Sequence, residues 1–147
     1  MSVTQETIKF NPSSGLISPV RYLPSPNADE RPDAEDISLI VIHSISLPPG
    51  EYTGNAIIEL FQNRLSAGEH PYFREIFELR VSAHFLIRRD GSLIQFVPVC
   101  KRAWHAGQSL FDGRERCNDF SIGIELEGTD TTPFELPQYR TLTALTK

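Results

Sequence analysis

Two stretches of the chain carry the hydrophobic pattern of long β-strands. Residues 37–45 are β-branched and almost wholly apolar, which is typical of a central strand that is covered on both faces. Residues 121–127 alternate strictly, so Ile122, Ile124 and Leu126 share one face while Glu125 lies on the other. Both stretches therefore predict strands of one sheet.

The remaining periodic segments predict a hairpin and two helices. Residues 82–88 and 93–99 flank an Asp90-Gly91 pair, a strong signal for a β-hairpin. Residues 55–65 have the apolar spacing of an amphipathic helix. Pro137, at a first helical position, begins a second helix, whose Leu142 and Leu145 face inward. This order predicts a mixed central β-sheet flanked by helices, of the α/β or α+β class.

The first 36 residues differ from the rest of the chain. Five of the 11 prolines fall there, and proline fixes φ and lacks an N–H donor. We therefore expect an irregular proline-rich arm over residues 1–36 and one domain over residues 37–147. Residues 101–120 are polar and lack a period, which indicates a long surface loop.

Composition excludes several classes of protein. A chain of 147 residues with a formal net charge of −5 suits one small domain and gives no electrostatic reason to bind nucleic acid or an anionic membrane. The opening six residues lack the basic and apolar regions of a signal peptide. The two cysteines, Cys100 and Cys117, are therefore expected to be reduced thiols in the cytoplasm.

Two residues stand out as candidates for chemistry. His43 ends the apolar strand before a Pro-Pro-Gly turn, where a neutral imidazole could bind zinc or serve as a hydrogen-bonded core residue. Glu125 lies between two isoleucines, and it could be a general base with a raised pKa or a solvent-facing residue.

Other histidines and the arginines leave alternatives open. His84 is expected to be a packed strand residue, while the loop at Trp104 and His105 could line a ligand site or be anchored by its tryptophan. Six arginines between residues 80 and 116 could bind an anionic substrate or pair with surface acids; they are Arg80, Arg88, Arg89, Arg102, Arg114 and Arg116. Nucleotide-binding, redox and serine-hydrolase motifs are absent from the sequence.

Four runs together resemble a known family. They are residues 31–50, residues 80–91, residues 101–107 with Trp104-His105-Ala106-Gly107, and residues 113–130 with Ser121-Ile122-Gly123-Ile124-Glu125-Leu126-Glu127. These runs resemble the zinc-dependent N-acetylmuramoyl-L-alanine amidases of type 2, whose fold is similar to peptidoglycan recognition proteins. The resemblance is strongest to the cytoplasmic 1,6-anhydro-N-acetylmuramyl-L-alanine amidases of peptidoglycan recycling, and it spans roughly residues 20 to 147.

The resemblance implies a role for individual residues. His43 matches a zinc ligand, and Glu125 matches the catalytic base that takes a proton from zinc-bound water. Arg80, Trp104 and Arg116 resemble positions that bind the substrate, a muropeptide. The implied reaction is hydrolysis of the amide between the lactyl group of N-acetylmuramic acid and L-alanine.

The resemblance also has a boundary. The family's other two zinc ligands, a His and an Asp, lie in a segment that follows the position of Lys147, so His43 is the one ligand of a single zinc ion expected here. We accordingly expect an amidase domain whose C-terminal part is missing. Three hypotheses follow: a zinc amidase, a muropeptide-binding module without hydrolysis, and a product that folds poorly. A cytoplasmic monomer with no nucleic-acid or membrane partner is expected.

Overall fold

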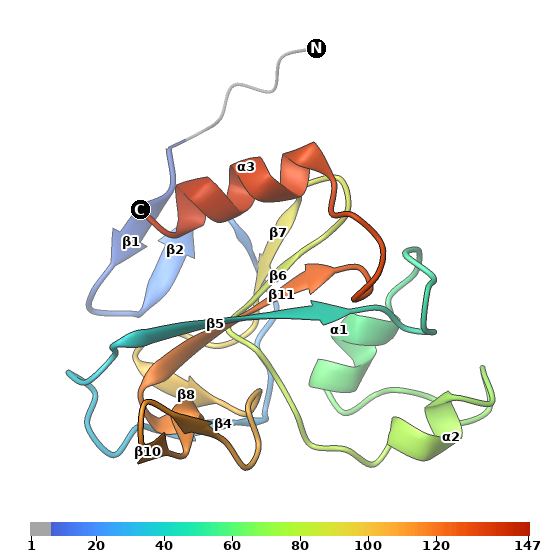
Figure 1. The fold of residues 1–147 in the computed structure, drawn as a ribbon, viewed down its shortest axis with the longest axis horizontal. Helices are drawn as coiled ribbons and strands as arrows, with labels where there is room; N and C mark the ends of the chain where they lie inside the picture. The colour runs from blue at the N-terminus through green and yellow to red at the C-terminus, as the bar shows by residue number, and fades with distance from the viewer. Residues whose placement is uncertain (1–6) are drawn as a thin grey trace.

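The computed structural model describes residues 7–147 and is built around a five-stranded mixed β-sheet (Figure 1). In spatial order its strands are β3 (Arg21–Tyr22), β7 (Leu93–Gln95), β6 (Phe85–Ile87), β11 (Ser121–Glu127) and β5 (Leu39–Ile45). Strand β11 runs parallel to both of its neighbours, whereas β6 and β7 are antiparallel. The expected mixed sheet is confirmed. The first six residues, where no signal peptide is expected, lie outside the described part.

The predicted hairpin is confirmed by β6 and β7. Gly91 takes a φ of 85°, which is costly for any other residue, and its N–H donates to the carbonyl of Arg88 at 2.8 Å. The Asp90 carboxylate accepts from the backbone N–H of Ser92 at 2.9 Å and closes the turn. The turn chemistry therefore sets the register of the two strands.

Helices cover the two faces of the sheet unequally. Helix α3 (Leu136–Leu145) packs with Leu142 and Leu145 against the core of β6 and β11, as predicted. The opposite face is covered by α1 (Ala56–Phe61) and α2 (Phe73–Ile76), whose apolar side chains surround Leu86. Figure 1 shows α3 on one side of the sheet and the two shorter helices near the end toward which β5 points. No helix in residues 7–147 has the length and apolarity that a bilayer crossing requires.

The expectation that residues 37–45 form a central strand is wrong. Strand β5 lies at the edge of the sheet, with the side chains of Ile40 and Ile42 44% and 49% exposed. Ile40 and Ile42 lie on the same face of the sheet as Ile124. The inward side chains of α3 pack against β6 and β11 and do not cover these two isoleucines. Apolar, β-branched composition favours a strand at the centre or at the edge of a sheet, and it does not indicate which element covers the strand.

The segment expected to be an irregular arm contains four short strands. Strands β1 (Lys9–Asn11) and β2 (Leu16–Ser18) form a hairpin, and β3 joins the main sheet. Strand β4 (Ala28–Glu30) pairs with β8 (Lys101–Ala103). Each spans two or three residues, which is too short for a readable period. The division into an arm at residues 1–36 and a domain at 37–147 stays a prediction.

The long loop expected at residues 101–120 is also more ordered than its composition indicates. Besides β8, it contains the hairpin of β9 (Leu110–Phe111) and β10 (Arg114–Glu115), followed by the 3-10 helix η1 (Cys117–Asp119). Cys117 is buried and Cys100 is half-buried, and both are free thiols, as expected.

Candidate functional site

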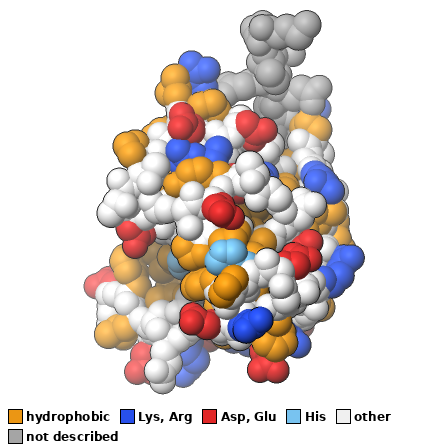
Figure 2. All heavy atoms as spheres, turned by 90° about the vertical axis from the view of Figure 1, so that its right-hand side faces the viewer, with side chains coloured by type: hydrophobic (Ala, Val, Ile, Leu, Met, Phe, Trp, Pro, Cys, Tyr) orange, Lys and Arg blue, Asp and Glu red, His pale blue; other side chains and the backbone are white. Residues whose placement is uncertain are grey.

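Strands β5 and β11 bring the two candidate residues together. Their parallel register pairs Glu125 with His43, so the two side chains are neighbours on one face of the sheet. This face is opposite to the one that α3 covers. Figure 2 shows histidine side chains reaching the surface between hydrophobic ones, on the side of the molecule toward which β5 points.

Glu125 is buried without a partner. Its side chain is 8% exposed, and its Oε2 atom has no hydrogen-bond partner among residues 7–147. Burial disfavours the charged form and raises the pKa of Glu125 to about 8. The solvent-facing interpretation is therefore wrong, and the carboxyl group has the properties of a base that exchanges protons near neutral pH.

Histidine side chains form a hydrogen-bonded chain beside Glu125. The Nε2 atom of His43 lies 2.9 Å from Nδ1 of His105, and Nε2 of His105 lies 3.0 Å from Oγ of Ser121. Burial lowers the pKa of His43, and burial followed by the neighbouring His43 lowers the pKa of His105 to about 3. Both rings are therefore neutral at pH 7, the form that binds a metal.

The loop that carries His105 is fixed by one side chain. The Oδ1 atom of Asn118, in η1, accepts hydrogen bonds from the backbone N–H groups of His105 at 3.1 Å and Ala106 at 2.9 Å. Of the two interpretations of this loop, a ligand-site wall gains support because His105 contacts His43. The contact between His105 and His43 was not predicted. Gly123, two residues after Ser121, is the sequence signal that could have indicated it, because the His105 ring occupies the space of a side chain at this position.

His84 is a packed residue, as expected, but it lies one residue before β6 and not in the strand. It is fully buried, its Nδ1 accepts from the backbone N–H of Gly123 at 3.1 Å, and its Nε2 lies 2.9 Å from the carbonyl oxygen of Lys101. Burial lowers the pKa of His84 to about 4.

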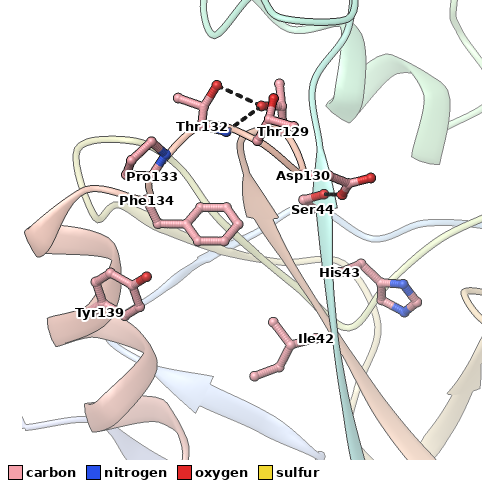
Figure 3. A pocket seen from close by; sticks show the side chains of 10 residues that line it. Ile42, His43, Ser44, Thr129, Asp130, Thr132, Pro133, Phe134 and Tyr139 are labelled. Atoms are coloured by element: carbon pink, nitrogen blue, oxygen red, sulfur yellow. Dashed lines mark hydrogen bonds between the residues drawn. The ribbon is translucent and has the colours of Figure 1, made fainter.

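His43 lies between two hollows. One, of about 550 Å³, has Ser44, Phe134 and Tyr139 among its lining residues (Figure 3). There the hydroxyl of Ser44 donates to Oδ1 of Asp130 at 2.8 Å. The second, of about 410 Å³, is lined by His105 and by apolar residues of β5 and β9. His43 is thus a lining residue of both hollows.

The three residues expected to bind substrate differ in their surroundings. Arg116 is exposed and lines a further hollow together with Ser109 and Leu110, which also line the hollow that contains His43. Arg80 is exposed, and its guanidinium donates to the carbonyls of Glu78 and Leu79. Trp104 is half-buried and follows β8. Arg116 thus lines a hollow next to one that His43 lines, and no contact joins His43 to Arg80 or Trp104 among the described residues.

Four of the six arginines pair closely with acidic side chains, and a fifth, Arg116, lies 3.5 Å from the carboxylate of Asp119. The pairs are Arg88 with Glu127, Arg89 with Glu135, Arg102 with Asp29 and Asp119, and Arg114 with Asp36. Of the two interpretations, pairing with acids is confirmed for these four, although the partner of Arg88, Glu127, is buried and not at the surface.

The described residues do not by themselves fit a zinc ion. In residues 7–147 no group of three or more His, Cys, Asp or Glu side chains is placed to hold a metal. His43 offers one suitable nitrogen, whereas a catalytic zinc needs three protein ligands. No chemical step through the metal follows from this part of the chain.

Comparisons with known proteins identify the family. The sequence profile of the family described as N-acetylmuramoyl-L-alanine amidase (Amidase_2) matches residues 33–147. The chain is 57% identical over 136 residues to the 1,6-anhydro-N-acetylmuramyl-L-alanine amidase AmpD of Salmonella typhimurium, and this match covers 92% of the chain and 73% of the relative.

Solved structures give the same result for the fold. A crystal structure of a selenomethionine derivative of AmpD superposes with a TM-score of 0.90 and 56% identity, over 94% of this chain and 76% of the other. An endolysin amidase from Clostridium intestinale has a TM-score of 0.55 and 19% identity, over 86% of this chain and 70% of the other, and shares the fold alone.

Proposed function

The chain belongs to the N-acetylmuramoyl-L-alanine amidase family, and on this premise we propose that it hydrolyses the amide bond between 1,6-anhydro-N-acetylmuramic acid and L-alanine in a muropeptide. The observation that carries the proposal is the pairing of Glu125, with a pKa of about 8, and His43 on neighbouring strands. The substrate that we propose for this chain is the one that the name of the Salmonella typhimurium relative gives.

Glu125 is the catalytic base in this proposal. Its carboxylate takes a proton from a water molecule, whose oxygen adds to the carbonyl carbon of the lactyl–alanine amide. When the C–N bond breaks, Glu125 returns the proton to the departing amine of L-alanine. A pKa near 8 suits both transfers, because the group can accept and release a proton near neutral pH.

His43 is the residue that we expect to bind zinc, the cofactor implied by the resemblance to type 2 amidases. A bound zinc ion lowers the pKa of a ligand water and polarises a carbonyl. Since residues 7–147 lack a complete ligand group, our assignment is limited to the neutral imidazole of His43.

Three further residues are proposed to bind the substrate. Arg116, beside the hollow next to His43, and Arg80 would pair with carboxylates of the stem peptide. Trp104 would pack against the sugar ring. We also propose that the protein acts as a cytoplasmic monomer, independent of nucleic acid and membrane.

The substitution Glu125→Gln tests the function. We expect it to lower kcat for release of stem peptide from an anhydromuropeptide by about 100- to 10,000-fold, because general base catalysis contributes this much. The assay is chromatography of the released peptide with zinc supplied. Glu69→Gln, at an exposed position, is the control and should retain the rate of the unmodified protein. Equal rates for the Glu125→Gln variant and the unmodified protein would refute the role of Glu125.

A second function, muropeptide binding without hydrolysis, is favoured by the lack of a three-ligand group in residues 7–147. Zinc stoichiometry and titration calorimetry with the same muropeptide separate the two functions. About one zinc per chain, lost in His43→Ala, together with peptide release supports the amidase. Muropeptide binding with neither zinc nor release supports the binding module.

A further inference from the structure

The imidazole of His105 occupies a position that the proposed reaction leaves unexplained. It contacts side chains of both β5 and β11 on one face of the sheet, with its ring edge-on to that of His43: the ring centroids are 5.2 Å apart and the planes make an angle of 76°. Both of its nitrogens have side-chain neighbours, His43 at 2.9 Å and Ser121 at 3.0 Å. The ring therefore links the edge strand to its neighbour through side chains.

Space for this ring comes from Gly123. A Cβ atom at Gly123 would lie 2.4 Å from Cγ and 2.5 Å from Cδ2 of His105, far inside the shortest real contacts. The φ angle of Gly123 is not among the positive values of this chain, so its backbone conformation does not require glycine. The lack of a side chain serves the close approach of the His105 ring.

Two more contacts hold the ring in place. Asn118 fixes the backbone at His105 through its Oδ1 atom, and Ser121 stands two residues before Gly123 on the same face of β11. The position of His105 is thus set by its loop, by the strand beneath it and by the hydroxyl group at its far nitrogen.

We propose that His105 is a positioning residue that accepts a hydrogen bond from Nε2–H of His43 and thereby keeps Nδ1 of His43 unprotonated and available to a ligand. In the same chain, Nε2–H of His105 donates to Oγ of Ser121. A neutral imidazole has one donor and one acceptor nitrogen, so the direction of one bond sets the direction of the next. The reverse chain, from Ser121 Oγ–H through His105 Nδ1–H to Nε2 of His43, is the alternative that the spectra below test. The inference rests on the proposed role of His43.

The tautomer of His43 is measurable without any enzyme assay. Long-range ¹H–¹⁵N correlation spectra of ¹⁵N-histidine protein at pH 8 distinguish a protonated from an unprotonated ring nitrogen. We expect His43 in the unmodified protein to be mainly Nε2-protonated. In His105→Leu the two His43 nitrogens should shift toward averaged values, because the acceptor is gone.

Matched variants separate positioning from packing. His105→Asn keeps an acceptor close to the former Nδ1 and should restore the spectrum of His43, whereas Gly123→Ala should reproduce the His105→Leu spectrum by displacing the ring. Ser121→Ala removes only one hydroxyl group, and it should shift the ¹⁵N signals of His105 more than those of His43. This variant keeps the test valid if His105→Leu does not fold. His70→Leu, in a separate turn, is the control and should leave His43 unchanged.

Kinetics and spectra together distinguish this inference from the proposed function. If hydrolysis is present, His105→Leu should lower kcat/KM by about 10- to 100-fold, with recovery in His105→Asn. An unchanged His43 tautomer in folded His105→Leu and Ser121→Ala overturns the positioning role whatever the amidase assay gives. If the expected spectral changes occur but no hydrolysis is detected, the positioning role of His105 is supported and only the proposed amidase activity is refuted.

Discussion

Two glutamates on one strand show how surroundings divide residues of the same type into different roles. Glu125 and Glu127 lie on the same face of β11, and both are buried. The Glu127 carboxylate accepts from the guanidinium of Arg88 at 3.0 Å and from the backbone N–H of Arg89 at 3.2 Å. Glu125 has an Oε2 atom with no such partner in residues 7–147. Glu127 is thus suited to holding loops together, and Glu125 is suited to accepting and releasing a proton.

The raised pKa of Glu125 predicts a stability change with pH. The folded state keeps its proton up to about pH 8, whereas the unfolded chain releases it near 4.5. The folded state therefore binds more protons in this window, and the free energy of unfolding contributed by Glu125 falls as pH rises from 4.5 to 8.

Urea unfolding between pH 6.5 and 8.5 checks this prediction. The unmodified protein should lose stability with rising pH, and Glu125→Gln, which cannot ionise, should flatten that slope. Glu69→Gln should keep the original slope. Parallel curves for the unmodified protein and Glu125→Gln would contradict the shifted pKa.

Residue pattern alone predicted part of this site. Strict alternation placed Glu125 on the face opposite Ile122 and Ile124, as observed. It could not predict burial, because alternation also fits a strand with one side in water. The pairing of His43 with Glu125 depends on a parallel register between distant segments, which no local pattern encodes.

At the scale of elements, helix α3 is attached to the sheet through one buried amide. Gln138 is fully buried; its Nε2 donates to the carbonyls of Ile87 at 3.2 Å and Glu127 at 2.9 Å. Its Oε1 accepts from the backbone N–H of Glu135 at 2.9 Å and completes a capping box. One side chain therefore caps the helix and joins it to β6 and β11.

Gln138→Met should destabilise the fold. A side chain of similar size fills the space but leaves the bonded carbonyls and one N–H unpaired, at a cost of about 2–4 kcal/mol in the free energy of unfolding. Chemical denaturation measures the loss. Arg140→Met, on the exposed side of the same helix, should change stability by less than about 0.5 kcal/mol. A loss as small for Gln138→Met would show that the amide bonds contribute little.

Elements with a local signal were predicted, and those that depend on distant partners were not. The hairpin follows from Asp90-Gly91 and α3 begins beside Pro137, because both signals act within a few residues. The edge position of β5 and the pairing of β4 with β8 depend on which segments meet in space. Short apolar or polar runs carry no information on that choice.

At the scale of the whole molecule, the guanidinium of Arg31 joins segments that lie far apart in the sequence. It is buried and donates to the carbonyls of Val99, Asn118 and Asp119 at 3.0–3.2 Å, and to that of Ser121 at 2.8 Å. The segments after β4 and before β8, together with η1 and β11, thus meet at one side chain. The same η1 segment holds the loop of His105.

Arg31→Lys is expected to lower the free energy of unfolding by about 2–4 kcal/mol, because a single ammonium group cannot supply the planar set of donors. Thermal unfolding and urea titration measure the change. Arg21→Lys, at an exposed position in β3, is the matched control with little expected effect. Equal stability of the two variants would show that the carbonyls find other donors.

The parallel register of β5 and β11 also bears on how the molecule folds. The strand at residues 39–45 meets the strand at residues 121–127 only after the intervening chain has been closed into a loop, and closing long loops costs chain entropy before any contact repays it. The β6–β7 hairpin needs no such closure. His43 and Glu125 should consequently acquire their shared environment late in folding, so the titration of Glu125 would report the final step of assembly and not the collapse that precedes it.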